Sequence, residues 1–354
     1  MWLTSSSIGR KFIMALTGAC LVLFVTFHVL MNSVALLWPA AYNSICGFLG
    51  ANWYALIASA GLAALFIIHI IYAVWLTVQN RRARGTSRYA VNSRPPQVEW
   101  SSKNMLVLGI VILAFLVVHM TQFWAKMQLQ ELISHEMTAF PVIAGAYAAP
   151  EFGTLFLQAA FELWWTPVVY IIGFVALWFH MNHGFWSMFH TIGWDNNVWI
   201  ERLKKIGCWW TSIVILLFVA QAILFTVQAK EKFFLTDPAL VAQYEEYLVE
   251  KAEPQIEDIR IKDDALRSQA YKMAPADAQK LFEDFILNEG PKYLETLAPV
   301  ATTAKVLVPN TESPVLKSVP AYVENITLSI EQIKQRRAAD AAAAAAENQT
   351  TDNN

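Results

Sequence analysis

Histidines are the residues of this chain whose chemistry is hardest to explain by packing, because six of the seven lie in strongly apolar sequence. Three of them, His180, His183 and His190, fall within one aromatic stretch, FHMNHGFWSMFH. The others are His28, His69 and His119 in further apolar segments, and His135 in a polar link. Burying an ionisable ring is costly, which favours a cofactor or a buried partner. For any single histidine, a hydrogen bond to a neighbouring carbonyl is an equally good explanation. The arrangement of all the histidines must therefore distinguish a cofactor site from structural roles.

Five apolar segments are long enough to position these rings inside a bilayer, which a helix of about 20 residues crosses. They are roughly residues 12–38, 53–79, 104–128, 161–190 and 206–229. With 56% hydrophobic residues, the chain is too apolar for an ordinary soluble domain. The first segment follows Arg10 and Lys11, as in a signal peptide. Its apolar run is much longer than a cleavable core, so we expect an uncleaved spanning helix.

Charge divides the chain into two parts. Residues 1–230 hold 13 Lys and Arg against 7 Asp and Glu, a net charge of +6, whereas residues 231–354 hold 13 against 21, a net charge of −8. We therefore predict a five-helix membrane domain over 1–230 and a polar, acidic extension over 231–354. The basic residues lie at the ends of apolar runs, a pattern that does not favour nucleic-acid binding. Their placement predicts a cytoplasmic N-terminus and an extension on the outside of the membrane.

The acidic extension is expected to be partly helical. Asp237 is typical of an N-cap and Pro238 of a first helical position, so TDPALVAQYEEYLVEKA predicts a helix. APADAQKLFEDFILNEG predicts a second helix that ends at its glycine. The proline-punctuated VLVPNTESPVLKSVP favours extended chain, and the alanine-rich end favours fraying. The extension carries no motif for catalysis or metal binding. A cap or a docking element for a partner is our hypothesis for it.

Depth in the membrane sorts the histidines of the first four segments into two levels. At about 1.5 Å per helical residue, His28 and His119 lie about 25 Å and about 24 Å from the nearest cytoplasmic basic residues. On the same scale, His69 lies about 18 Å from Arg81, and His180 lies at most about 22 Å from Asp195, or less if the helix stops near His190. Two facing histidines at one depth are what bis-histidine ligation of a b haem needs. We therefore expect two haems, an outer one on His28 and His119 and an inner one on His69 and His180.

The two remaining histidines of the opening stretch receive different roles. His183 follows His180 by three residues, so both rings point to roughly the same face of the helix. His183 lies about 4.5 Å nearer the cytoplasm, where haem propionates are expected. We predict that it contacts a propionate or supports the ligand, with axial ligation as the alternative. His190 is expected to mark the interfacial end of the helix.

Two other kinds of site fit the sequence less well. Zinc needs three or four ligands at one depth, whereas these histidines come in twos. The three cysteines, Cys20, Cys46 and Cys208, form no CxxC or CxxCH pattern. Their spacing argues against a disulfide framework, a structural zinc site and covalently attached haem. We interpret them as small apolar filling residues.

Five sequence elements together carry a family resemblance. They are SSSIGRKFIMALTG, FVTFHVLMNSV, FIIHIIYAVW, VVHMTQFW and FHMNHGFWSMFHTIGW. Through them residues 1–230 resemble the single-chain, five-helix, dihaem cytochrome b subunit of succinate:quinone oxidoreductases, the succinate dehydrogenase and fumarate reductase family. The resemblance covers about two thirds of the chain and implies the same pairing of the four histidines. The acidic extension departs from the family, whose members typically end soon after the fifth helix.

The resemblance implies an anchor in a bacterial cytoplasmic membrane, surrounded by lipid. Dicarboxylate chemistry in that family lies in a separate flavoprotein, and an iron–sulfur subunit connects the two. This agrees with a sequence that has no GxGxxG motif and no cysteine cluster. Electrons would pass between the iron–sulfur partner, the two haems and a quinone, usually menaquinone. Arg10, with Ser5 to Ser7 nearby, is expected to bind the propionates of the inner haem.

A quinone site at the outer haem is also implied. Polar and aromatic residues at the outer helix ends could serve it, namely Asn32, Trp53, Gln122, Trp124, Lys126 and Glu162. Each of them is equally well explained as a helix end or as part of the interfacial belt.

Two other functions stay open from the sequence. One is a dihaem cytochrome b that serves a hydrogenase, a formate dehydrogenase or an ascorbate-type donor. The other is a haem-free membrane transporter or scaffold in which the histidines are structural.

Overall fold

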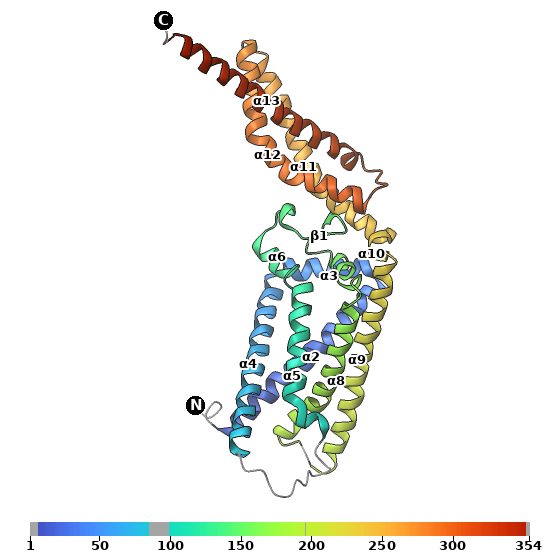
Figure 1. Ribbon diagram of the computed structural model, residues 1–354. Coiled ribbons are helices and arrows are strands. Elements are labelled where there is room, and N and C mark those ends of the chain that lie inside the picture. Colours follow the sequence, from blue (N-terminus) through green and yellow to red (C-terminus); the bar gives the residue numbers. More distant parts are fainter. Residues whose placement is uncertain (1–5, 85–98, 195, 352–354) are drawn as a thin grey trace. The chain divides into compact units, whose positions relative to one another are not determined.

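Five long helices lie side by side in the computed structural model (Figure 1), which describes residues 6–84, 99–194 and 196–351. They are α2 (Ser7–Leu37), α4 (Trp53–Arg84), α5 (Trp100–Gln122), α8 (Thr166–Thr191) and α9 (Trp199–Lys230). All five are long and apolar enough to cross a membrane. The prediction of an all-α, multi-pass bundle is therefore confirmed in its coarse form.

The chain divides into two compact units. The membrane unit comprises Met1–Glu131 and Pro150–Phe234, and the C-terminal unit comprises Leu132–Ala149 and Leu235–Asn354. The segment 132–149 lies between two membrane helices in the sequence and yet packs within the C-terminal unit. Each unit therefore contains two separate stretches of the chain.

Glycines bring the membrane helices close together. A Cβ on Gly173 of α8 would lie 2.5 Å from Cγ of Phe115 on α5. A Cβ on Gly207 of α9 would lie 2.6 Å from Cδ1 of Phe185 on α8. Each glycine therefore lets an aromatic ring of the neighbouring helix reach the backbone, as small residues do in membrane bundles. These contacts set the position of α8, the central helix that packs against α2, α5 and α9.

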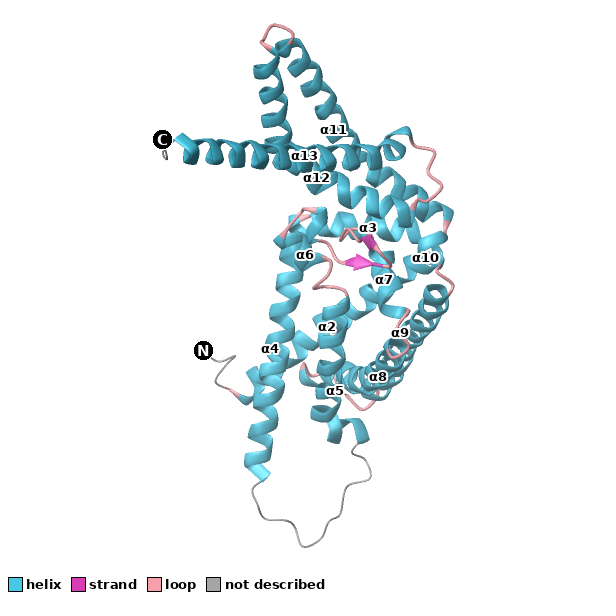
Figure 2. Cartoon of the chain, turned by 45° about the horizontal axis from the view of Figure 1, so that its top comes forward, coloured by secondary structure: helices cyan, strands magenta, loops and turns pink. Residues whose placement is uncertain are grey.

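Two short helices, α3 (Pro39–Ala51) and α7 (Gly153–Phe161), pack against each other at the end of the bundle where α9 finishes (Figure 2). The sequence pattern treats the first as a connecting link, but Pro39 opens a helix there. The buried Asn43 side chain accepts a hydrogen bond from the backbone N–H of Thr154 at 3.0 Å. Burial raises the pKa of the nearby Cys46 thiol to about 12, which agrees with its interpretation as a filling residue.

Two membrane helices are shorter than their apolar runs predict. The third run is expected to reach residue 128, but α5 ends at Gln122 and turns follow. The fourth run is expected to be one helix from residue 161, but Phe161 closes α7 and α8 begins at Thr166. Hydrophobicity alone does not show these breaks, because the apolar residues continue through them.

The link between α5 and α7 is built from short elements. They are α6 (Gln128–Ile133), a 3-10 helix at Met137–Ala139, and the antiparallel strands β1 (Val142–Ile143) and β2 (Ala146–Tyr147). Ala144 and Gly145 join the strands with positive φ angles of 52° and 92°. Two consecutive positive φ angles are typical of a tight hairpin turn. Tyr147 then donates its backbone N–H to Thr303 Oγ1 of the C-terminal unit at 3.1 Å.

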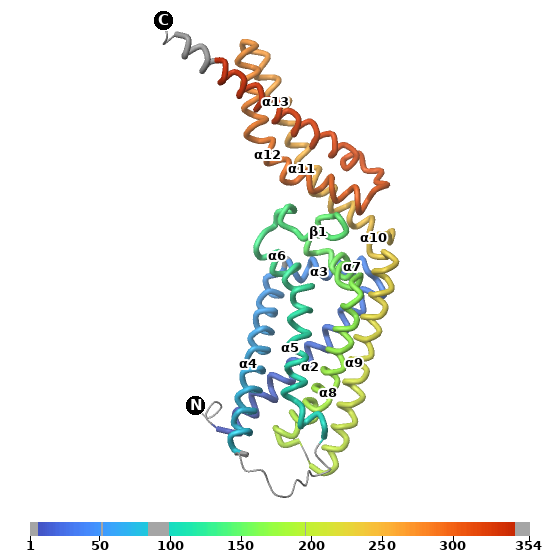
Figure 3. Tube along the Cα trace, viewed as in Figure 1, coloured from blue at the N-terminus to red at the C-terminus, as the bar shows by residue number. Residues whose placement is uncertain are grey.

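Three long helices form most of the C-terminal unit, which the tube in Figure 3 traces after the short α10 (Phe233–Thr236). They are α11 (Pro238–Ala270), α12 (Pro275–Leu307) and α13 (Pro314–Thr351). The predicted cap is confirmed, since Asp237 accepts hydrogen bonds from the N–H groups of Ala239 and Leu240 at 3.1 Å.

Two details of the predicted extension are wrong. The second helix does not end at Gly290 but continues to Leu307. A Cβ on Gly290 would lie 3.1 Å from side-chain atoms of Ile326 and Ile330 on α13. Gly290 therefore serves helix packing rather than termination. The stretch expected to be extended is helical from Pro314 onward, and only residues 308–313 interrupt the helices. The alanine-rich end is helical through Thr351.

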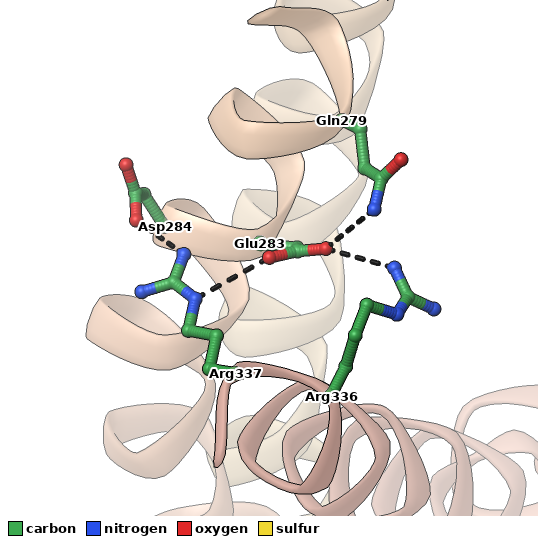
Figure 4. Close-up of polar contacts among 5 residues, drawn as sticks. All are labelled: Gln279, Glu283, Asp284, Arg336 and Arg337. Carbon is green, nitrogen blue, oxygen red and sulfur yellow. Dashed lines mark hydrogen bonds and ion pairs between the residues drawn. The ribbon is translucent and has the colours of Figure 1, made fainter. Parts of the chain in front are cut away.

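A charge cluster joins α12 and α13 (Figure 4). Glu283 accepts hydrogen bonds from Gln279 at 2.8 Å and from Arg336 at 2.9 Å, and its other oxygen lies 3.3 Å from Arg337. Arg337 also donates to Asp284 at 2.7 Å. These contacts hold the two helices together by pairing the acidic face of α12 with a basic pair on α13.

Gly173→Ala is expected to destabilise the membrane unit, because the new methyl group overlaps the Phe115 ring and forces α8 away from α5. Overpacking of this kind costs about 1–3 kcal/mol. Thermal unfolding of the purified chain in detergent measures it. Gly61→Ala is the matched control, since no described atom outside its own helix lies within 4 Å of its added Cβ. Equal unfolding temperatures for the two variants would contradict this packing role.

Candidate functional site

Four histidines from four helices meet in two pairs inside the membrane unit. The ring centroids of His28 (α2) and His119 (α5) lie 5.8 Å apart, with ring planes at 80°. Those of His69 (α4) and His180 (α8) lie 6.3 Å apart, at 64°. The structure thus brings together the same pairs that helix depth groups. A metal ion about 2 Å from one nitrogen of each ring sets such centroids about 6 Å apart. Both pairs therefore fit the spacing of two axial ligands on one haem iron.

Each pair has one histidine that is hydrogen-bonded to a hydroxyl group from another helix. His69 Nδ1 lies 3.1 Å from Thr17 Oγ1 of α2. His119 Nδ1 lies 3.1 Å from the Tyr170 hydroxyl of α8. Tyr170 in turn donates to Gln122 Oε1 at 2.9 Å. In both cases the contact uses Nδ1 and leaves Nε2, the outward nitrogen of the ring, for another partner.

The second histidine of each pair is held differently. His180 Nδ1 is buried and has no hydrogen-bond partner among the described residues. His28 has a contact at its other nitrogen, where Nε2 lies 3.4 Å from Asn32 Nδ2. Such a distance is long for a hydrogen bond, so it constrains the ring weakly. These two rings are thus less strongly fixed than His69 and His119.

The residues expected near a quinone separate into two groups. Asn32 and Gln122 are linked by hydrogen bonds to the pair of His28 and His119, directly or through Tyr170. The others lie outside this set of hydrogen bonds among the described residues. The Trp53 ring lies 3.7 Å from the Tyr54 ring at a tilt of 31°, Trp124 donates to Gln128, Lys126 is exposed, and Glu162 pairs with Lys232.

Arg10 lies close to α4 at the N-terminal end of α2. Its guanidinium lies 5.3 Å from the centre of the Trp75 ring. With the Gln79 amide oxygen facing its donors, Arg10 Nη1 and Trp75 Nε1 each donate to it at 2.9 Å. Arg10 Nε is buried without a partner among the described residues. A buried, unpartnered cationic donor suits an anionic group such as a propionate. Of the nearby serines, Ser6 caps α2 and Ser5 lies outside the described residues.

His183 contacts a residue that the sequence pattern does not single out. Its Nδ1 lies 3.3 Å from Glu99 Oε2, and Lys204 of α9 lies 4.0 Å from the other oxygen of the same carboxylate. The Lys204 ammonium also lies 5.1 Å from the centre of the Trp186 ring. This cluster connects the start of α5 to α8 and α9. The exposed His190 lies in the last turn of α8, at the helix end where it is expected.

Thr17 and Tyr170 are the residues of this site that sequence reasoning misses. Both are polar groups in apolar helices, and both precede a paired histidine of their own helix by about three turns. Thr17 precedes His28, and Tyr170 precedes His180. That spacing is a usable signal, but each hydroxyl serves the histidine of a different helix, and only the packed bundle shows it.

No family model, curated protein or solved structure matches this chain in the three comparisons made.

Glu162→Gln is expected to lower stability at neutral pH by less than about 1 kcal/mol, because the pair is half exposed. Hydrogen bonds from Lys232 and then Gln158 lower the pKa of the Glu162 carboxyl. A lowered pKa means that its stabilisation is present at neutral pH and is lost as the pH falls through that pKa. The wild type and the variant should therefore converge in acid, as thermal unfolding across pH measures. Lys232→Met supplies a double-mutant cycle, and fully additive losses would contradict a direct pair.

Proposed function

We propose that this chain is the membrane-anchoring, dihaem cytochrome b subunit of a succinate:quinone oxidoreductase. The main support is that four helices each supply one histidine to two pairs. Within each pair, the distance between the rings fits two ligands of one haem iron. The family-like elements that contain these histidines support the choice among cytochromes b. The lipid-exposed character of the five helices supports an anchor.

The chain's own residues would hold the two haems at different depths. Thr17 is level with His69 and lies about three turns before His28. Tyr170 is level with His119 and lies about three turns before His180. Both helices therefore give a separation of about 15 Å along the bundle between the two pairs. Such a separation supports a path for electrons across the membrane.

Each pair would ligate one haem, His69 with His180 and His28 with His119. A bound haem supplies one-electron transfer at a potential set by its ligands and surroundings. The apolar helices exclude water from the ligands, and Arg10 would neutralise propionate charge beside the pair of His69 and His180. His183, with Glu99, would support that same haem at the end of the bundle where α2 begins.

The partners follow from this arrangement. The N-terminus of the chain would be cytoplasmic, so the pair of His69 and His180 would be the inner one and would face an iron–sulfur subunit and its flavoprotein. A quinone, menaquinone as the first choice, would bind at the outer pair, where Asn32 contacts His28 and Gln122 is linked to His119 through Tyr170. Lys126 and Glu162 would act at the rim of such a site. The membrane would be the cytoplasmic membrane of a bacterium.

His69→Ala is expected to remove one haem and spare the other, because the two sites share no histidine. The haem content per chain should fall by half, and the α-band of a reduced-minus-oxidised spectrum should lose one component. His28→Ala should remove the complementary component. His135→Ala and His190→Ala are controls that should keep both haems. An unchanged two-haem spectrum in His69→Ala would refute the assignment, and a wild type without any α-band would indicate a haem-free transporter or scaffold.

Purification of the tagged full chain from its native membrane tests the partners. We expect a flavoprotein with covalently bound flavin and an iron–sulfur protein to accompany it, because the dicarboxylate chemistry of the family that the chain resembles lies in a separate flavoprotein. Mass spectrometry and flavin fluorescence identify them. Recovery of a hydrogenase or a formate dehydrogenase instead would assign the two haems to a different respiratory complex.

A further inference from the structure

We propose that Thr17 and Tyr170 are positioning residues that fix the tautomer of one histidine in each pair, so that its Nε2 lone pair is presented to the haem iron. This inference rests on the proposed function, since it concerns how the same two sites are prepared for their cofactor. It assigns a role to two hydroxyl groups that do not themselves contact the iron.

With its hydrogen directed to the backbone, the Thr17 hydroxyl is an acceptor for His69. A hydroxyl has one hydrogen to donate, and Thr17 directs it to the backbone carbonyl of Ile13 at 2.9 Å, with that of Met14 at 3.1 Å. Its oxygen is therefore an acceptor for the 3.1 Å contact with His69 Nδ1. The ring must then carry its hydrogen on Nδ1, and in the neutral tautomer Nε2 keeps a free lone pair. Thr17 is 3% exposed, so water cannot substitute for it.

The Tyr170 hydroxyl reaches the same result at the other pair. Its single hydrogen goes to Gln122 Oε1 at 2.9 Å. The Gln122 amide is held in that orientation because its Nε2 donates to Thr166 Oγ1 at 3.1 Å. The phenol oxygen therefore accepts from His119 Nδ1 at 3.1 Å, and Nε2 of His119 is left as an acceptor. Tyr170 is 4% exposed, so its hydroxyl is also shielded from water.

The partner histidines show that this is a division of roles rather than a general property of buried rings. The Nδ1 atom of His180 has no hydrogen-bond partner among the described residues, and His28 has only a long contact at Nε2. Each pair thus combines one ring whose tautomer is fixed by a hydroxyl group with one ring whose tautomer is not fixed in this way. Hydrogen-bonded imidazoles are oriented and more basic ligands, so the preset ring suits the first bond to iron.

Each hydroxyl also comes from a helix that carries a histidine of the other pair. Thr17 lies on α2 with His28, and Tyr170 lies on α8 with His180. Loss of one hydroxyl should therefore change only the haem at its own level, even though its helix serves the other haem. A merely structural loss in α2 or α8 would affect both haems, which makes the two roles separable.

Thr17→Val and Tyr170→Phe in the purified complex test the inference. Thr17→Val should raise the midpoint potential of the haem on His69 and His180, because a less basic imidazole stabilises the oxidised iron less. It should also speed transfer of that haem to apomyoglobin by about 10- to 100-fold. Tyr170→Phe should do the same to the other haem. Spectroelectrochemical titration resolves the two potentials, and Thr17→Ser should restore the wild-type value.

Thr26→Val is the matched control for Thr17→Val. Thr26 lies on the same helix and donates to the carbonyl four residues earlier at 2.8 Å, as Thr17 does, but its oxygen accepts from Trp210 rather than from a histidine. It should leave both potentials unchanged.

Three results would overturn the inference. Unchanged potentials and haem retention in Thr17→Val and Tyr170→Phe, with two haems in the wild type, would overturn it alone and leave the proposed function standing. Equal shifts of both haems in either variant would replace it with a structural role. A wild type that binds no haem would overturn the proposed function as well. Tyr170→Phe removes a single oxygen atom, so it decides the matter if Thr17→Val does not accumulate.

Discussion

Placing four imidazole rings inside an apolar bundle is the constraint on which the rest of the membrane unit depends. Burying a single ionisable ring among apolar helices costs free energy. In this bundle the rings instead meet in pairs, and they come from four different helices. Such meetings require the helices to be close, and Gly173 and Gly207 allow that closeness at α8. The hydrogen bonds of Thr17 and Tyr170 then consume ring nitrogens that would otherwise be unsatisfied. In this unit, the close packing of the helices and the hydrogen bonding of the ring nitrogens therefore depend on each other.

Helix number and histidine pairing could be predicted because both follow from local sequence. Apolar length marks the helices, and counting residues from basic ends groups His28 with His119 and His69 with His180. The same count places His28 and His69 only about 7 Å apart in depth, whereas the helix registers give about 15 Å between the two levels. The count assumes that Lys11 and Arg81 lie at one depth. Arg10 actually contacts Trp75 and Gln79, so Arg81 lies further toward the end of the bundle.

What could not be predicted depends on contacts between distant segments. The helix α3 is short and follows a long apolar run, so its sequence alone predicts a link. Its packing against α7 is seen only in the structure. Gly290 has the residue type of a helix end, but it lies inside α12, where the lack of a side chain lets Ile326 and Ile330 of α13 pack against it. The pairing of His183 with Glu99 is another such case, since His183 lies on α8 and Glu99 directly precedes α5. In contrast, Asp237 caps α11 as expected, because a cap is a local structure.

The assignment of residues 132–149 to the C-terminal unit has a consequence for biosynthesis. This segment leaves the ribosome well before residues 235–354, with which it packs. Its hydrogen bond from Tyr147 to Thr303 can form only after a further 156 residues have been made. The connection between α5 and α8, which each carry one histidine of a different pair, therefore stays incomplete until that part of α12 has been synthesised. A segment that interrupts the membrane unit in the sequence is thus packed only after all five long helices of that unit have been made.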